Sequence, residues 1–188
     1  AALVPAAGRY MPIPSEGGHI AFGPETDEDF QLWPHLPRFH GRISAEAVLS
    51  GNGLARIHTA VCRLEGAGEV QPTGRDVTLA AEAGDPLAAR AVSLFCRWLG
   101  RVCGDYALVF LARGGVYVGG GIVPQIVDRF DGAAFREAFE AKAPHEALVR
   151  AIPAFVILKE RPALDGLAAF ARDPNRFALS LVGRRLRA

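Results

Sequence analysis

The sequence has few cysteines, and their number and spacing do not suit disulfides that would stabilise a fold. Its 188 residues include three, Cys62, Cys96 and Cys103. An odd number without Cys-x-x-Cys spacing argues against both a disulfide scaffold and a zinc site. Cys96 and Cys103 are seven residues apart in a segment of helical pattern, so they share a helix face. We therefore expect buried, small hydrophobic side chains in a protein of the reducing cytoplasm.

An excess of charge and long hydrophobic runs are also missing. The formal net charge is +1, which gives no electrostatic basis for binding nucleic acid or an anionic membrane. The longest uncharged run, Gly114 to Val127, is too short for a membrane span. With 50% hydrophobic and 22% charged residues, the composition is that of an ordinary globular protein, and the length favours one domain.

Two common phosphate-binding signatures are absent, because neither Gly-x-Gly-x-x-Gly nor a lysine-containing phosphate loop occurs. The sequence instead has a glycine-rich segment, Gly114–Pro124, with the triplet Gly119, Gly120 and Gly121. The triplet lies between a predicted strand and a predicted helix, where backbone N–H groups and the helix dipole can approach a nucleotide or phosphate. A simple tight turn is the alternative interpretation.

Two further segments carry side chains suited to holding a sugar. Ser15–His19 contains Glu16 and His19, and Ser44–Gly51 contains Glu46. An ionised carboxylate accepts hydrogen bonds from two hydroxyls at once, and an imidazole adds a donor or an acceptor. Taken singly, Glu16 and His19 are typical of an ordinary turn and Glu46 of a solvated helix. A metal site at His19 is disfavoured, because no second histidine or cysteine lies at ligand spacing.

The hydrophobic pattern predicts a mixed α/β fold. Two short apolar pieces, over 2–5 and 10–13, predict a hairpin, and a break is expected at Gly51-Asn52-Gly53. Apolar residues at helical spacing and short β-rich runs predict the remaining elements: helices over 27–33, 44–49, 54–64, 86–110, 124–130, 135–139 and 164–172, and strands over 116–118 and 154–158. Strands followed by helices favour a mixed sheet flanked by helices.

In this order, the motifs resemble the bacterial glucokinase family, which belongs to the actin-like and hexokinase-like ATPases. The resemblance is carried by Glu16–His19, Ser44–Gly51 and Gly114–Pro124, and it continues through Leu94–Gly100, Phe135–Lys142, Ala151–Pro153 and Pro162–Leu164. It implies an actin-like ATPase (RNase H-like) large-domain lobe over residues 1–172, truncated at its N-terminus, and a C-terminal tail extension over 173–188. In the tail, Phe177, Leu179, Leu181 and Val182 predict packing against the rest of the protein.

The resemblance also implies a function, the phosphorylation of the glucose 6-hydroxyl by ATP with Mg2+. Glu16, His19 and Glu46 match the family's sugar-holding residues, and Gly119–Gly121 matches a nucleotide-contacting turn. In the family, the general base is an aspartate of a preceding small domain, and the phosphate loops also precede the position of Ala1. We therefore expect that the chain begins inside a strand, is a fragment, carries no catalytic residue and cannot phosphorylate glucose without that domain.

Two alternatives stay open beside a kinase, namely a non-catalytic, sugar-binding regulatory module and an inactive truncated kinase. Related regulators carry a cysteine-rich zinc motif, which the three cysteines do not form. Gln125 stands where the family has an arginine, and Asp165 stands at a usually apolar position and has no explanation. The sequence does not determine an oligomeric state, so a homodimer also stays open.

Overall fold

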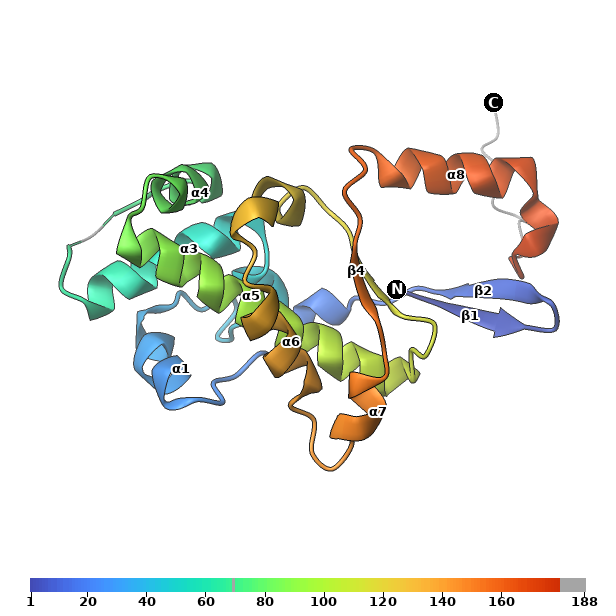
Figure 1. Ribbon diagram of the computed structural model, residues 1–188, viewed down its shortest axis with the longest axis horizontal. Helices are drawn as coiled ribbons and strands as arrows, with labels where there is room; N and C mark the ends of the chain where they lie inside the picture. The colour runs from blue at the N-terminus through green and yellow to red at the C-terminus, as the bar shows by residue number, and fades with distance from the viewer. Residues whose placement is uncertain (69, 180–188) are drawn as a thin grey trace. The chain divides into compact units, whose positions relative to one another are not determined.

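The computed structural model describes residues 1–68 and 70–179, which form two compact units (Figure 1). Among the described residues, one unit combines residues 1–17 with 159–179, and the other is Gly18–Leu158. The helices and strands in chain order are β1 (Ala2–Ala6), β2 (Arg9–Ile13), α1 (Asp27–Leu32), α2 (Ala45–Val48), α3 (Gly51–Leu64), α4 (Gly74–Glu82), α5 (Pro86–Phe110), β3 (Val116–Val118), α6 (Gly132–Glu140), α7 (Glu146–Arg150), β4 (Ala154–Val156) and α8 (Pro162–Arg172).

The first unit contains the predicted hairpin, which is confirmed. β1 and β2 pair antiparallel, with Ala2 opposite Ile13. Between them, Ala7 and Gly8 have φ angles of 48° and 75°. Two successive residues with positive φ give the tight turn whose twist matches that of the flanking strands.

Residues after α8 pack within this first unit. The amide of Ala178 donates to the carbonyl of Tyr10 at 2.8 Å, and Tyr10 and Phe177 form a parallel bridge. The Phe177 ring lies 5.4 Å from that of Phe170 in α8. Packing of the tail is therefore confirmed at Phe177, whereas Leu179 is 42% exposed and Leu181 and Val182 lie outside the described residues.

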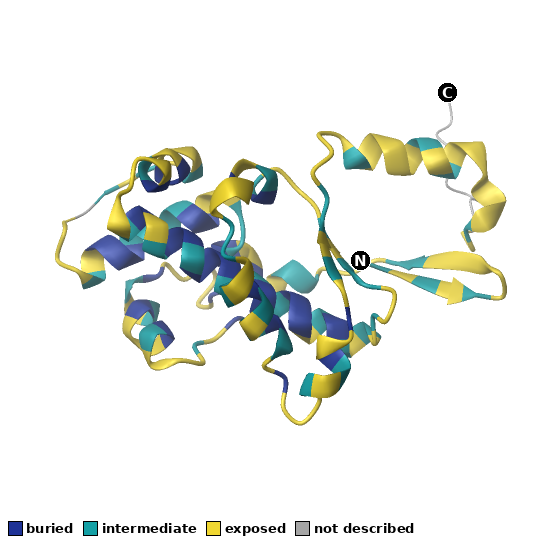
Figure 2. Ribbon diagram, viewed as in Figure 1, coloured by how far each residue is buried: buried dark blue, intermediate teal, exposed yellow. Residues whose placement is uncertain are grey.

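The centre of the second unit is α5, and the predicted long buried helix is confirmed. The Asp85 carboxylate accepts from the amides of Leu87 and Ala88 at 2.8 and 2.9 Å, and Pro86 occupies the first turn, as helix starts favour. Because apolar residues recur on all its sides, α5 is buried along most of its length (Figure 2). None of the described helices has both the length and the apolar character of a membrane span.

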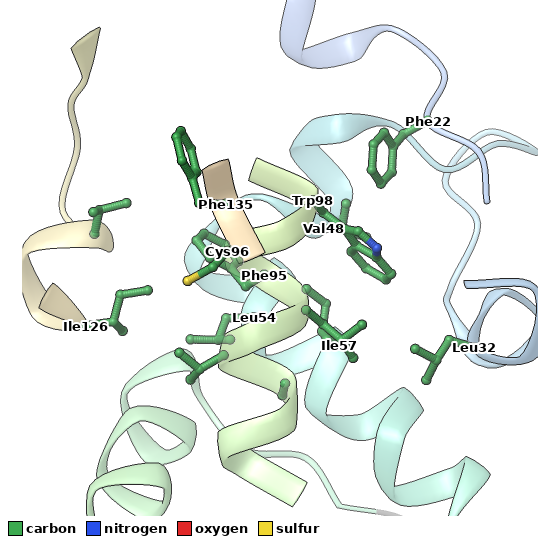
Figure 3. Close-up of a cluster of buried hydrophobic side chains, with 14 of the residues drawn as sticks. Phe22, Leu32, Val48, Leu54, Ile57, Phe95, Cys96, Trp98, Ile126 and Phe135 are labelled. Carbon is green, nitrogen blue, oxygen red and sulfur yellow. The ribbon is translucent and has the colours of Figure 1, made fainter. Parts of the chain in front are cut away.

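The core gathers where α3 and α6 pack against α5 (Figure 3). Trp98 and Phe95 of α5 are each 1% exposed, and Ile57 of α3 is fully buried. Helices α5 and α6 approach closely because α5 carries Gly100 and Gly104 at the contact. A Cβ atom at either position would overlap a carbonyl of α6, so this packing depends on glycine.

The predicted helix break at Gly51-Asn52-Gly53 is wrong. These residues form the first turn of α3, and Ser50 caps that turn by accepting from the Gly53 amide at 3.0 Å. Gly53 is needed for space, since a Cβ there would overlap the backbone of Val48. The chain therefore changes direction at Leu49–Ser50.

Three further features differ from expectation. In the described residues the strands form two separate pairs rather than one mixed sheet, because β1 pairs with β2 and β3 pairs parallel with β4. The expected helix over 124–130 is instead two 3-10 turns, Val123–Gln125 and Val127–Arg129, with Pro124 in the first. Helices α4 and α7 have no counterpart among the expected elements.

Candidate functional site

Backbone pairing within the second unit sets the end of one sugar-binding candidate segment beside the start of the other. The amide of Phe22 donates to the carbonyl of Ile43 at 2.9 Å, and the amide of Ala45 donates to the carbonyl of Ile20 at 3.3 Å. This short antiparallel pairing sets the 3-10 turn Gly17–His19 beside the start of α2. His19 and Glu46 each lie one residue beyond the hydrogen-bonded Ile20 and Ala45.

The sequence of α2 turns the Glu46 carboxylate to solvent. Ser44 caps the helix by accepting from the Ala47 amide at 3.3 Å. Ala45, Ala47 and Val48 are buried in the core, while Glu46 between them is exposed. A methyl group built at Gly18 would lie 3.2 Å from Glu46 Oε2. One oxygen of this exposed carboxylate therefore lies next to the glycine of the 3-10 turn.

The three sugar-binding candidates are divided between the two units. His19 and Glu46 belong to the second unit, and Glu16 belongs to the first. All three side chains are exposed. Glu16 immediately precedes the 3-10 turn, whose entry is fixed by the Gly17 amide donating to Ser15 Oγ at 3.0 Å. The structure thus juxtaposes the segments of His19 and Glu46, and it places Glu16 on the strand side of the turn.

The glycine triplet lies at the carboxyl end of β3. There the Ile157 amide, just beyond β4, donates to the Val118 carbonyl at 2.9 Å. Gly120 has a φ of 135°, which side chains disfavour. Gly119 and Gly121 have no such φ, and a Cβ at Gly121 would have no neighbour within 4 Å. The turn therefore leaves accessible backbone at the edge of a parallel strand pair, where ligands commonly bind in α/β folds.

A buried ionic cluster escaped the sequence analysis. The Asp29 carboxylate, 1% exposed, accepts from Trp98 Nε1 at 2.8 Å, from Arg97 at 2.6 Å and from Arg101 at 3.2 Å. Burial acts to raise the pKa of Asp29, but the Trp98 hydrogen bond, backbone amides and the Arg97 charge outweigh it, so the pKa falls below its ordinary value. The cluster ties α1 to α5. The available signal was Thr26-x-x-Asp29, which forms a capping box.

The described residues offer no metal centre. Among them, no three histidine, cysteine, aspartate or glutamate side chains lie together where an ion could be held. The cysteines are free and buried, and burial raises the pKa of Cys96 and of Cys103 to about 12. They behave as the expected small hydrophobic side chains.

The family model for glucokinase matches residues 1–174. The glucokinase of Sinorhizobium fredii (strain NBRC 101917 / NGR234) is 46% identical over 188 residues, which cover 100% of this chain and 56% of that protein. A glucokinase structure from an Antarctic psychrotroph superposes with a TM-score of 0.83 at 31% identity, covering 91% of this chain and 53% of the other. A ROK family glucokinase from Streptomyces griseus, solved with glucose and AMPPNP, superposes with a TM-score of 0.58 at 21% identity, covering 89% and 54%.

In fold, the chain matches proteins that are sugar kinases, and its paired turn and helix carry the residues that the glucokinase resemblance singled out. The chain belongs to the glucokinase family. It spans about half the length of the curated relatives that it matches.

Proposed function

We propose that this chain is the sugar-binding part of a glucokinase that transfers the terminal phosphoryl group of ATP to the 6-hydroxyl of glucose. The observation that carries the proposal is the backbone pairing that sets the 3-10 turn of His19 against the helix of Glu46. In the proposal, Glu16, His19 and Glu46 hold the sugar hydroxyls. Two carboxylates and an imidazole suit this task, because each replaces water at several hydroxyl groups.

For ATP, we propose contact with the backbone of the turn Gly119–Gly121. Two of its glycines are required by neither backbone conformation nor packing inside the chain, which fits a ligand approaching the backbone. A structural neighbour is a glucokinase solved with AMPPNP, which supports nucleotide use. The described residues do not supply a set of side chains for Mg2+, so the proposal assigns the ion no ligand in this chain.

The role of these residues in the reaction is positioning. Phosphoryl transfer depends mainly on alignment of the acceptor hydroxyl and on charge stabilisation. A sugar fixed through its other hydroxyls presents the 6-hydroxyl in one orientation, and exclusion of water prevents hydrolysis. In the proposal, the general base and the phosphate loops come from residues outside these 188. Residues 1–172 then correspond to the large-domain lobe of an actin-like ATPase and 173–188 to an extension of it.

The proposal extends to where and how the chain works. We propose a cytoplasmic protein, which fits its free, buried thiols. A homodimer remains a proposal that sedimentation of the purified chain would test. Without the general base, the isolated chain is expected to form no glucose 6-phosphate from ATP and glucose.

Calorimetric titration with glucose tests the sugar site. Glu46→Ala and Glu16→Ala should each weaken binding about tenfold or more, since a hydrogen bond to a charged group contributes roughly 1.5–3 kcal/mol. Glu82→Ala, at an exposed glutamate on α4, is the matched control and should bind like the parent chain. Equal binding by all three variants would place the sugar elsewhere.

A second measurement separates the kinase from its alternatives. Adding ATP to the glucose-bound chain and assaying glucose 6-phosphate should give no product. Product formation would contradict the assignment of the base to another domain. A fusion of this chain to the N-terminal half of its Sinorhizobium fredii relative provides the second test. If the fusion protein binds glucose but forms no glucose 6-phosphate, a regulatory module or an inactive kinase describes the chain better than an active kinase does.

A further inference from the structure

A cavity of about 390 Å³ lies between α1, α5 and α6, inside the second unit. Its lining includes Glu25, Thr26, Glu28 and Asp29, one face of α5 between Arg90 and Arg101, and residues of α6 and its C-terminal end between Ala134 and Ala141. It contains neither the sugar-binding candidates nor the glycine turn, so it is separate from the site of the proposed reaction. Its volume is in the range of small-molecule sites.

Part of the lining of this cavity is apolar and small. It consists of Leu94 of α5, Ala134 and Ala138 of α6, and Ala141, which follows α6. The alanines leave the space open, because a longer side chain on this face of α6 would fill it. Apolar lining of this kind suits the C–H face of a ring.

The polar part of the lining is a fixed array of donors and acceptors. Arg97 donates to Glu28 at 2.7 Å and to Asp29 at 2.6 Å, and Arg90 donates to Glu28 at 2.9 Å. The base of the array is rigid, because the Asp29 and Arg101 side chains are 1% and 7% exposed. Its rim is reachable, since the Arg97 and Glu28 side chains are 27% and 32% exposed.

The charged side chains that line the cavity disfavour binding of an anion. Three arginines face four carboxylates, those of Glu25, Glu28, Asp29 and Glu137. The arginines are already paired with carboxylates, so an incoming anion would have to break ion pairs. Neutral hydroxyl groups need not, because a hydroxyl accepts from a spare guanidinium N–H and donates to a carboxylate oxygen at the same time. The Glu137 carboxylate, which takes part in none of these ion pairs, adds an acceptor at the mouth.

We propose that this cavity binds a neutral, polyhydroxylated ring of hexose size, as a second sugar site outside the reaction centre. The apolar lining takes the C–H face of the ring, and the Arg90–Glu28–Arg97 array takes its hydroxyls. The site rests on the cavity alone and not on the proposed reaction. Its occupant holds α1 and α6 to α5, so binding stabilises the fold.

Calorimetry with glucose and with myo-inositol as neutral probes, and glucose 6-phosphate as the anionic probe, tests the site. Ala138→Leu fills the cavity without touching an ion pair. Ala133→Leu is the matched control, because it adds the same atoms to the same helix at an exposed position outside the cavity. The parent chain and Ala133→Leu should show two glucose sites, whereas Ala138→Leu should lose one. Glu46→Ala should weaken binding at the other about tenfold or more, so that a separate variant identifies each site.

Unchanged stoichiometry and affinity for both neutral probes in Ala138→Leu would overturn the proposal. Glucose 6-phosphate binding more tightly than glucose at the Ala138-sensitive site would overturn the assignment of a neutral ligand. If Ala138→Leu does not fold, Glu137→Gln replaces it and should weaken the second site about tenfold. Loss at Ala138→Leu with no effect of Glu46→Ala would support this cavity and count against the proposed reaction site.

Discussion

The Glu46 carboxylate lies over Gly18, so closely that a methyl group at position 18 would stand 3.2 Å from Oε2. Gly18 has no positive φ. Its lack of a side chain therefore matters for space and not for backbone conformation. The residue at position 18 consequently controls where a carboxylate on a different segment of the chain is held.

Gly18→Ala should weaken glucose binding several-fold and leave the midpoint of thermal unfolding within about 2 °C. The added methyl pushes the Glu46 carboxylate by a few tenths of an ångström, and positional errors of this order reduce binding and catalysis. Calorimetry and thermal denaturation measure the two effects. Gly23→Ala is the control, since a Cβ there meets nothing within 4 Å. Equal losses in both variants would contradict a specific effect on Glu46.

Gly100→Ala should destabilise the fold by roughly 2–4 kcal/mol in urea-induced unfolding. The new Cβ would overlap the carbonyl of Phe135, and backbone cannot yield as a flexible side chain does, so α6 must move away from α5. Gly132→Ala, at the open first position of α6, should have no such cost and should gain slightly from helix propensity. Equal stability of the two variants would mean that the α5–α6 contact is looser than described.

Asp29→Asn should destabilise the fold by about 3–5 kcal/mol at pH 7, because it leaves Arg97 and the buried Arg101 without their shared charge partner. The pKa of Asp29 is lowered in the folded protein from its ordinary value of 3.8. Its contribution is therefore fully present above that ordinary value and is lost as the pH falls through the lower, folded pKa.

Urea unfolding of the parent chain and of Asp29→Asn between pH 2 and 7 measures this difference. The two stability curves should converge as the pH falls. Asp128→Asn, at an exposed position in a 3-10 turn, should change stability by less than about 0.5 kcal/mol. A constant gap between the parent and Asp29→Asn over the whole range would show that the charge of Asp29 is not what stabilises the cluster.

The thiols should resist alkylation in the folded protein. Burial raises the pKa of Cys96 and of Cys103 to about 12, and it raises the pKa of Cys62 as well. Since the thiolate is the reactive form, iodoacetamide at pH 7.5 should leave all three unmodified by mass spectrometry. The same treatment in urea should modify all three. Rapid modification of the folded chain would mean that local opening exposes α3 or α5.

The sequence pattern predicted those helices and strands whose start or turn is determined by residues close together in the chain. The start of α5 at Asp85-Pro86 and the hairpin of β1 and β2 follow from capping and turn chemistry within a few residues. Helix α4 was not predicted although Thr73-x-x-Asp76 forms a capping box, because its only large apolar residues, Val77 and Leu79, are two positions apart and show no helical spacing. That local signal was present and unused.

A single sequence does not show which residues that are distant along the chain contact one another in the fold. Asp29 meets Arg101 across 72 positions, and no spacing rule identifies such a pair. The same limit applies to the sheets, because strand propensity does not state which strand pairs with which. At the candidate site, the residue types of Glu16, His19 and Glu46 were visible in the sequence. The contact between Gly18 and Glu46 needed coordinates.

The first unit combines residues from near both ends of these 188, and the Ala178 amide donates a hydrogen bond to the Tyr10 carbonyl. Ribosomes extend a polypeptide toward its C-terminus at about 5–20 residues per second. The hairpin therefore waits roughly ten to thirty seconds for its partner, and an isolated hairpin is marginal in water. The second unit is contiguous and meets its own contacts during that interval. The hairpin is thus synthesised before the second unit, but it pairs with the segment after α8 only once the second unit is complete. A stop codon within the final turn of α8 would remove that pairing.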